Sequence, residues 1–139
     1  MMMKRIRNCN QGTAALEFAI ISPIFILVLL TLVAYGIYLS AAHSVQQIAA
    51  NAARTAVAGV TAAERTQLVN SYITTSTLND PILQRANFTV SVTPDPGNAN
   101  QFVVSLVYNA QNLPIWNLYS FAMPSKTITR TATIRMGGI

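Results

Sequence analysis

The hydrophobic positions of the chain form one long run near the N-terminus, and shorter patterned segments follow it. No charged residue occurs in residues 18–42, a stretch of about 25 residues. A helix needs around 20 apolar residues to cross the hydrocarbon core of a bilayer. The run therefore predicts a membrane-spanning helix, which we place at residues 13–42.

Beyond this run the pattern becomes that of amphipathic helices. Apolar side chains at helical spacing form one stripe over residues 44–58. We expect one continuous helix over residues 13–58, ended by the glycine that follows. Thr61 and Glu64 have the spacing of a capping box, which predicts a second helix ending near Ser76.

The C-terminal half alternates apolar and polar residues with the two-residue period of strands. Three segments show this period, at residues 88–93, 102–108 and 127–134. A stretch rich in turn-forming residues, 94–98, joins the first two as a hairpin. We predict an α+β fold, in which a long N-terminal helix, transmembrane in its first half, packs on a small three-stranded antiparallel sheet.

One connecting segment, residues 109–124, is more apolar than loops usually are. It contains Trp116, the only tryptophan of the chain, and Tyr119. One interpretation is a lid that packs over the helix and the sheet. The other is a surface patch that faces a partner or the membrane interface, because tryptophan and tyrosine are enriched in both places.

The distribution of charge predicts how the chain is oriented across the membrane. The chain is 52% hydrophobic and 9% charged, and three of its basic residues, Lys4, Arg5 and Arg7, precede the apolar run. The positive-inside rule places this basic head in the cytoplasm and residues 43–139 on the outer side of the inner membrane. The net charge of +5 does not indicate a nucleic-acid partner, because no basic patch with interleaved aromatics follows the head.

The titratable residues do not indicate catalysis. His43 is the only histidine and stands at the end of the apolar run. The acids outside that run are Glu64 in the capping box, and Asp80 and Asp95, which each precede a proline in a turn. We therefore expect no enzyme activity, no metal site and no cofactor.

The remaining acid, Glu17, stands almost at the start of the apolar run. A carboxylate in a spanning helix is unfavourable unless a partner uses it. Three interpretations of the N-terminus are open: a cleaved secretory signal, an uncleaved signal anchor, and a class III signal that is processed at the cytoplasmic face. The secretory signal fits least well, because its apolar stretch would be shorter. The anchor explains the length of the run but not Glu17.

The residues around Glu17 resemble a known signal. A short basic leader (residues 1–12) ends in Gly12, four residues intervene, and Glu17 and Phe18 open the apolar helix. This pattern resembles the prepilin-peptidase signal of type IV-like pilins. With Pro23 following, it is similar to the TadE-like minor pilins of the tight-adherence (Flp) pilus system.

The resemblance implies that the predicted α+β fold is pilin-like, and it implies a function. A prepilin peptidase would cut between Gly12 and Thr13, and Glu17, followed by Phe18, would neutralise the new N-terminal amine of an adjacent subunit. The partners would be the membrane, the peptidase, other pilins or pseudopilins and an inner-membrane assembly platform. Pro23 is either a flexible point for leaving the bilayer or an ordinary membrane proline. The alternative function is an uncleaved single-pass membrane protein whose outer domain binds a partner.

Overall fold

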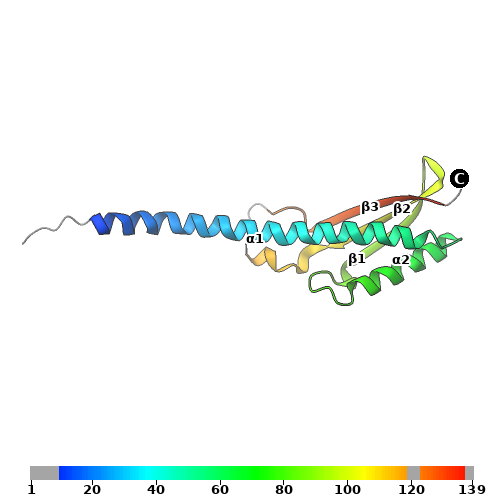
Figure 1. The fold of residues 1–139 in the computed structure, drawn as a ribbon, viewed down its shortest axis with the longest axis horizontal. Helices are drawn as coiled ribbons and strands as arrows, with labels where there is room; N and C mark the ends of the chain where they lie inside the picture. Colours follow the sequence, from blue (N-terminus) through cyan, green and yellow to red (C-terminus); the bar gives the residue numbers. More distant parts are fainter. Residues whose placement is uncertain (1–9, 119–122, 137–139) are drawn as a thin grey trace, which may run out of the picture.

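One long helix organises the molecule. The computed structural model describes residues 10–118 and 123–136, so the basic residues of the leader and Tyr119 lie outside the described residues. Helix α1 (Asn10–Ala56) is a 47-residue helix. Its first part projects away from the rest of the chain, and its second part packs against α2 and a three-stranded sheet (Figure 1).

The sheet is an antiparallel meander in sequence order. It consists of β1 (Phe88–Asp95), β2 (Asn98–Asn109) and β3 (Thr127–Arg135), with β2 in the centre. The hairpin between β1 and β2 is tighter than the predicted loop 94–98, because Asp95 already pairs with Asn98. The Asp95 carboxylate accepts a hydrogen bond from the Gly97 N–H at 2.8 Å, which holds the turn. The predicted α+β fold is confirmed.

The two helices are joined by a short turn whose polar groups are satisfied by side chains. Helix α2 (Ala62–Thr77) begins with the predicted capping box, in which the Glu64 N–H donates to Thr61 Oγ1 and the Thr61 N–H donates to Glu64 Oε2. Arg65 reaches back and donates to the carbonyls of Gly59 and Val60, each at 3.0 Å. These bonds fix the direction in which α2 returns along α1.

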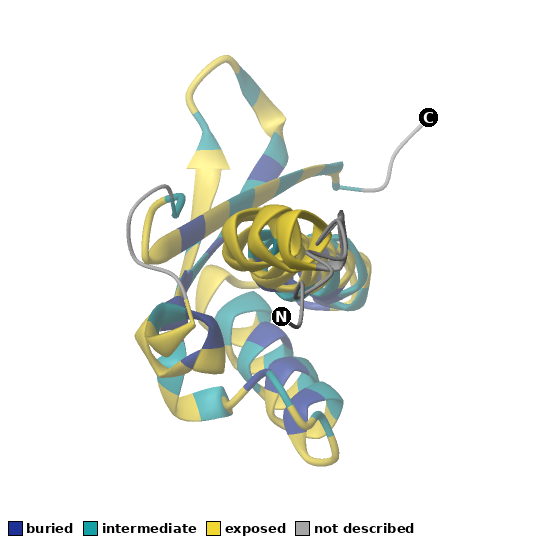
Figure 2. Cartoon of the chain, turned by 90° about the vertical axis from the view of Figure 1, so that its left-hand side faces the viewer, coloured by how far each residue is buried: buried dark blue, intermediate teal, exposed yellow. Residues whose placement is uncertain are grey.

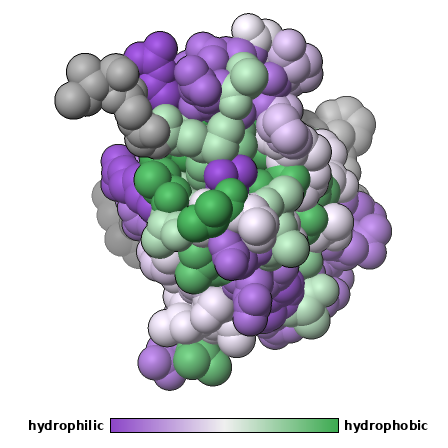
Figure 3. All heavy atoms as spheres, turned by 90° about the vertical axis from the view of Figure 1, so that its right-hand side faces the viewer, coloured by the Kyte–Doolittle hydropathy of each residue, from purple (hydrophilic) through white to green (hydrophobic). Residues whose placement is uncertain are grey.

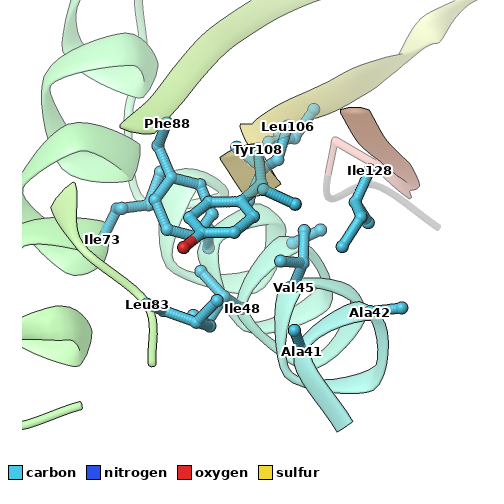
Figure 4. Packing of buried hydrophobic residues seen from close by; sticks show 14 of the residues in the cluster. Ala41, Ala42, Val45, Ile48, Ile73, Leu83, Phe88, Leu106, Tyr108 and Ile128 are labelled. Atoms are coloured by element: carbon cyan, nitrogen blue, oxygen red, sulfur yellow. The ribbon is translucent and has the colours of Figure 1, made fainter. Parts of the chain in front are cut away.

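The hydrophobic core lies between α1, α2 and one face of the sheet. Seen from the N-terminal end, the nearest part of α1 is exposed, whereas buried positions lie where the elements face one another (Figure 2). The α1 side of the core consists mainly of small residues: Ala34, Ala41, Ala42, Val45, Ile48, Ala49, Ala52, Ala53 and Ala56. The sheet and α2 supply larger ones, which lie close together beside α1 in Figure 4: Ile73, Phe88, Leu106, Tyr108 and Ile128. Small residues on the helix let it approach this surface closely.

Candidate membrane anchor and assembly site

The first half of α1 presents apolar side chains to its surroundings on every side. Large hydrophobic residues from Leu16 to Val33 are between 37% and 73% exposed. Within the described residues, α1 is the one helix long and apolar enough to cross a membrane, with a mean hydropathy of 2.6 and 6% of its most apolar window buried. The core helix of a soluble protein would be mostly buried, so this exposure favours contact with lipid.

The residues of the predicted signal lie on the first turns of α1. The helix begins at Asn10 rather than at the predicted Thr13, so the Gly12–Thr13 bond lies within its first turn. The N–H groups of a first turn have no partner within the helix, which makes this turn the easiest part to unwind. Glu17 is exposed one helical turn after Thr13, on the same side of the helix. Phe18 beside it is 73% exposed.

Pro23 lies inside α1 without ending it. The helix continues from Asn10 to Ala56, and Figure 1 shows it as one continuous rod. Proline has no N–H, so the carbonyl of Ala19, four residues earlier, receives no helical hydrogen bond from position 23. The structure thus has a locally weaker point in the exposed half of the helix.

The domain formed by α2 and the sheet begins to cover α1 at Ala34, which is fully buried. Ile37 and Tyr38 pack against the same core. The Tyr38 hydroxyl donates to the Ser125 carbonyl at 3.2 Å, joining the helix to the segment before β3. Residues from Ala34 onward therefore contribute to the domain, although they lie in the segment 13–42 that the sequence predicts as spanning.

The apolar segment after β2 contains two short 3₁₀ helices, η2 (Ala110–Asn112) and η3 (Pro114–Asn117). Leu113 and Ile115 are buried in the core, as a lid over helix and sheet requires. Trp116 is half-buried, and its indole N–H donates to the Ala110 carbonyl at 2.6 Å.

The end of this segment meets the exposed half of α1. Leu118 is 42% exposed. It lines an apolar groove together with α1 residues Ser22, Pro23, Ile26, Leu27 and Leu30. Lys126 Nζ lies 5.5 Å from the centroid of the indole ring of Trp116. We call Trp116, Leu118 and Lys126 the membrane-proximal tip.

Three of the four carboxylates hold backbone turns, as their positions in the sequence predict. Asp80 Oδ1 accepts hydrogen bonds from the N–H groups of Ile82 and Leu83, each at 2.8 Å. Glu64 accepts hydrogen bonds from the backbone of Thr61 and Val60, and these bonds lower the pKa of its carboxyl group. With Asp95 in the hairpin turn, Glu17 is the acid for which the fold of the domain provides no role.

The described residues offer little to metal or substrate chemistry. Residues 10–118 and 123–136 contain no group of three or more His, Cys, Asp or Glu side chains placed to hold a metal ion. His43 is exposed on α1. An open hollow is lined in part by Gly59 and Val60. The end of the molecule at which α1 and α2 are joined shows hydrophobic atoms bordered by hydrophilic ones (Figure 3). Glu64, which borders the hollow, is already engaged in capping α2.

The sequence did not predict the contact that Tyr38 makes with the domain, or the part that Leu118 and Lys126 take in the membrane-proximal tip. The contact between Tyr38 and Ser125 joins residues 87 positions apart, and no local pattern reports such a pair. Leu118 carries a weak signal, since it extends an apolar segment that already contains Trp116.

Comparison with known proteins gives one match. Residues 12–54 match the family model described as TadE-like protein, which covers less than a third of the chain and lies entirely within α1. Neither the curated proteins nor the solved structures gave a match. The matched segment begins at Gly12 and includes Glu17, Phe18 and Pro23. The resemblance predicted from these residues is confirmed, and the chain carries a TadE-like N-terminal helix.

Proposed function

We propose that the chain is a minor pilin or pseudopilin that takes part in the assembly of a tight-adherence (Flp) pilus. The observation that carries the proposal is one exposed carboxylate, Glu17, on a lipid-facing helix that matches the TadE-like family from Gly12 onward. The role requires a membrane anchor and contact surfaces. It requires no catalytic group, cofactor or nucleic acid.

Processing is the first proposed step. A prepilin peptidase at the cytoplasmic face cuts after Gly12 and removes the basic leader, residues 1–12. The mature chain then begins with the amine of Thr13. Because Gly12 has no Cβ and the bond lies in the first helical turn, the backbone can unwind into a protease cleft at little cost.

Membrane insertion follows from the exposed apolar surface of α1. The N-terminus lies in the cytoplasm, and residues 43–139 form the extracytoplasmic domain. Within the predicted spanning segment, residues 13–42, we assign lipid contact to residues 13–33, because the domain covers the helix from Ala34 onward.

Assembly depends on Glu17. A carboxylate and an ammonium group are both unfavourable in lipid when they are alone and much less so when they are paired. We therefore assign Glu17 to the N-terminal amine of an adjacent subunit, with exposed Phe18 packing beside that contact. Pro23 weakens the helix six residues further on and lets it adjust when it leaves the bilayer for the assembly. Trp116 and Tyr119 remain candidates for contact with other pilins, the platform or the membrane interface.

The mature N-terminus tests the processing step. Mass spectrometry of the chain purified from cells with a tight-adherence system should give Thr13 as the first residue, with or without N-methylation. An intact leader would favour the second candidate, an uncleaved single-pass membrane protein with a partner-binding outer domain. The only observation in favour of that second candidate is the packed domain, which could bind a partner. It leaves Glu17 without a role.

The pairing step has its own test. Glu17→Gln keeps the size of the side chain and removes its charge, whereas Glu17→Asp keeps the charge. We expect Glu17→Gln to lose co-purification with other pilins and Glu17→Asp to retain more of it. Leu16→Ala, at a neighbouring exposed position, is the matched control. Wild-type co-purification by Glu17→Gln would contradict the pairing.

A further inference from the structure

We propose that the membrane-proximal tip is inserted into the outer leaflet of the bilayer and has phospholipid as its partner. The inference rests on the membrane span of the proposed function. It does not depend on processing at Gly12 or on the pairing of Glu17. It gives the outer domain a fixed orientation on the membrane before any partner binds.

The position of the bilayer along α1 is the first step. The 21 residues 13–33 extend about 31 Å at about 1.5 Å per residue, and the hydrocarbon core is about 30 Å thick. Large hydrophobic residues are exposed in an unbroken series up to Val33, and Ala34 is the first residue buried by the domain. Beyond Ala34, Leu39, 62% exposed, is the one large hydrophobic residue of α1 that is still exposed. A bilayer ending any earlier would leave Leu32 and Val33, 64% and 53% exposed, in water. The edge of the hydrocarbon therefore lies near Val33.

The second step is the depth of Leu118. It shares a groove with Ile26, Leu27 and Leu30. Leu30, the α1 residue of the groove nearest the domain, precedes Val33 by three residues, which places it about 4.5 Å inside the edge of the hydrocarbon. Leu118 is 42% exposed and lies at this depth, so acyl chains fill the groove between it and α1.

The third step is the chemistry of the neighbouring residues. The Trp116 N–H already donates to the Ala110 carbonyl, so the ring enters an apolar region without an unsatisfied donor. Lys126 Nζ lies over the same ring at 5.5 Å and is exposed. An aromatic ring with a cation beside it is typical of the interface, where the ammonium group binds lipid phosphate and the ring lies at head-group level.

The helix of a second subunit is the competing occupant of the groove. It would fill an apolar groove equally well, but it gives no reason for an exposed lysine beside the tryptophan. The bilayer that α1 crosses already covers Leu118 at its depth, so no second subunit is needed to shield this side chain from water. Lipid therefore accounts for the whole tip, and the second copy for one part of it.

Trp116 is the only tryptophan of the chain and so reports directly on the tip. The full-length protein is reconstituted in phosphatidylcholine and phosphatidylglycerol vesicles at high dilution, and an alkaline wash verifies integration. The lipids carry bromine either near the head-group end or near the methyl end of the acyl chains. We expect roughly two-fold or greater quenching by the shallow bromine, less by the deep bromine and little by aqueous acrylamide, because interfacial tryptophan lies near the head groups.

Two leucine variants complete the test. Leu118→Asp should reduce bromine quenching and increase acrylamide quenching, with an unchanged circular dichroism spectrum. Leu78→Asp is the matched control, because Leu78 is 71% exposed at the end of α2 and does not line the groove.

The possible outcomes distinguish failure of the inference about the membrane-proximal tip from failure of the proposed membrane span. If the washed protein stays in the vesicles but acrylamide quenches Trp116 in full, the tip is in water and the inference is wrong. If neither quencher reaches Trp116 and protection increases with the protein-to-lipid ratio, a second copy covers it and the inference is also wrong. If the wash removes the protein, the membrane span of the proposed function fails.

Discussion

Gly59 occupies the turn between α1 and α2 at a point where no side chain fits. A Cβ built on it would lie 2.8 Å from the Arg65 backbone nitrogen and 2.9 Å from Arg65 Cγ. We expect Gly59→Ala to destabilise the domain by about 1–3 kcal/mol through overpacking, measured by denaturant unfolding. Gly36→Ala is the matched control, because nothing lies within 4 Å of its Cβ position. That change in a helix should be neutral or stabilising. Equal effects of the two substitutions would contradict the steric argument.

Glu64 makes the stability of the domain depend on acid pH. Its hydrogen bonds from the backbone of Thr61 and Val60 lower its pKa from the usual 4.5. A lowered pKa means that the stabilisation is present above pH 4.5 and is lost as the pH falls through the lower folded value. We expect Glu64→Gln to lower the unfolding midpoint at neutral pH.

The same variant provides the control for that titration. Protonated glutamate resembles glutamine, so the difference between wild type and Glu64→Gln should shrink as the pH falls below 4.5. Midpoints from urea unfolding at a series of pH values measure it. A difference that stays constant across the series would show that the charge of Glu64 does not contribute.

At the scale of elements, the small residues of α1 allow it to approach the rest of the core. Ala52 is fully buried on the side of α1 that faces the core, whereas Gln47 is exposed. We expect Ala52→Leu to cost about 1–3 kcal/mol, because the added carbons would push α1 out of contact. Gln47→Leu places the same side chain on the exposed face and should change stability little. Thermal unfolding of both variants measures the difference, and similar midpoints would contradict the packing model.

The elements could be predicted from the sequence because each has a local signal. Alternation identified the three strands, and Thr61 with Glu64 identified the start of α2. The ends were less accurate, since α1 begins at Asn10 and ends at Ala56 rather than covering residues 13–58. Hydrogen bonds of terminal turns depend on neighbours, such as Arg65 reaching the Gly59 carbonyl, which no periodicity contains.

The candidate site could be predicted only where its residues are close together in the sequence. Gly12, Glu17, Phe18 and Pro23 lie in one short stretch, and the family match covers that stretch. Leu118 could not be placed against α1 from the sequence, because its contact depends on how the whole segment after β2 folds back. Hydropathy likewise could not divide the apolar run, since leucine in lipid and alanine in a protein core give the same signal.

For the whole molecule, α1 is both the proposed membrane anchor and one wall of the core. Its large hydrophobic residues up to Val33 are exposed, and from Ala34 onward one side of the same helix is buried. The change occurs without a break in the helix, and the hydrogen bond from Tyr38 to Ser125 joins α1 to the domain just beyond this point. This continuity predicts where the chain can be cut without loss of the domain.

A fragment of residues 34–139 should fold, whereas a fragment of residues 43–139, which begins at the sequence-predicted boundary, should be much less stable. The shorter fragment lacks Ala34, Ala41 and Ala42 from the core, together with the hydrogen bond from Tyr38. Removing residues 34–42 of α1 exposes apolar surface of the sheet. We expect the free energy of unfolding to fall by an amount on the order of 2–5 kcal/mol, as for deletion of a large core side chain.

Urea unfolding followed by the fluorescence of Trp116 compares the two fragments. Tyr38→Phe in the longer fragment removes only the hydroxyl and should cost about 1 kcal/mol, which separates the hydrogen bond from the packing. If both fragments unfold at the same urea concentration, residues 34–42 do not belong to the domain. The bilayer could then extend to Ala42, and Leu118 would lie deep in the hydrocarbon, where an interfacial tryptophan beside Lys126 would not be stable.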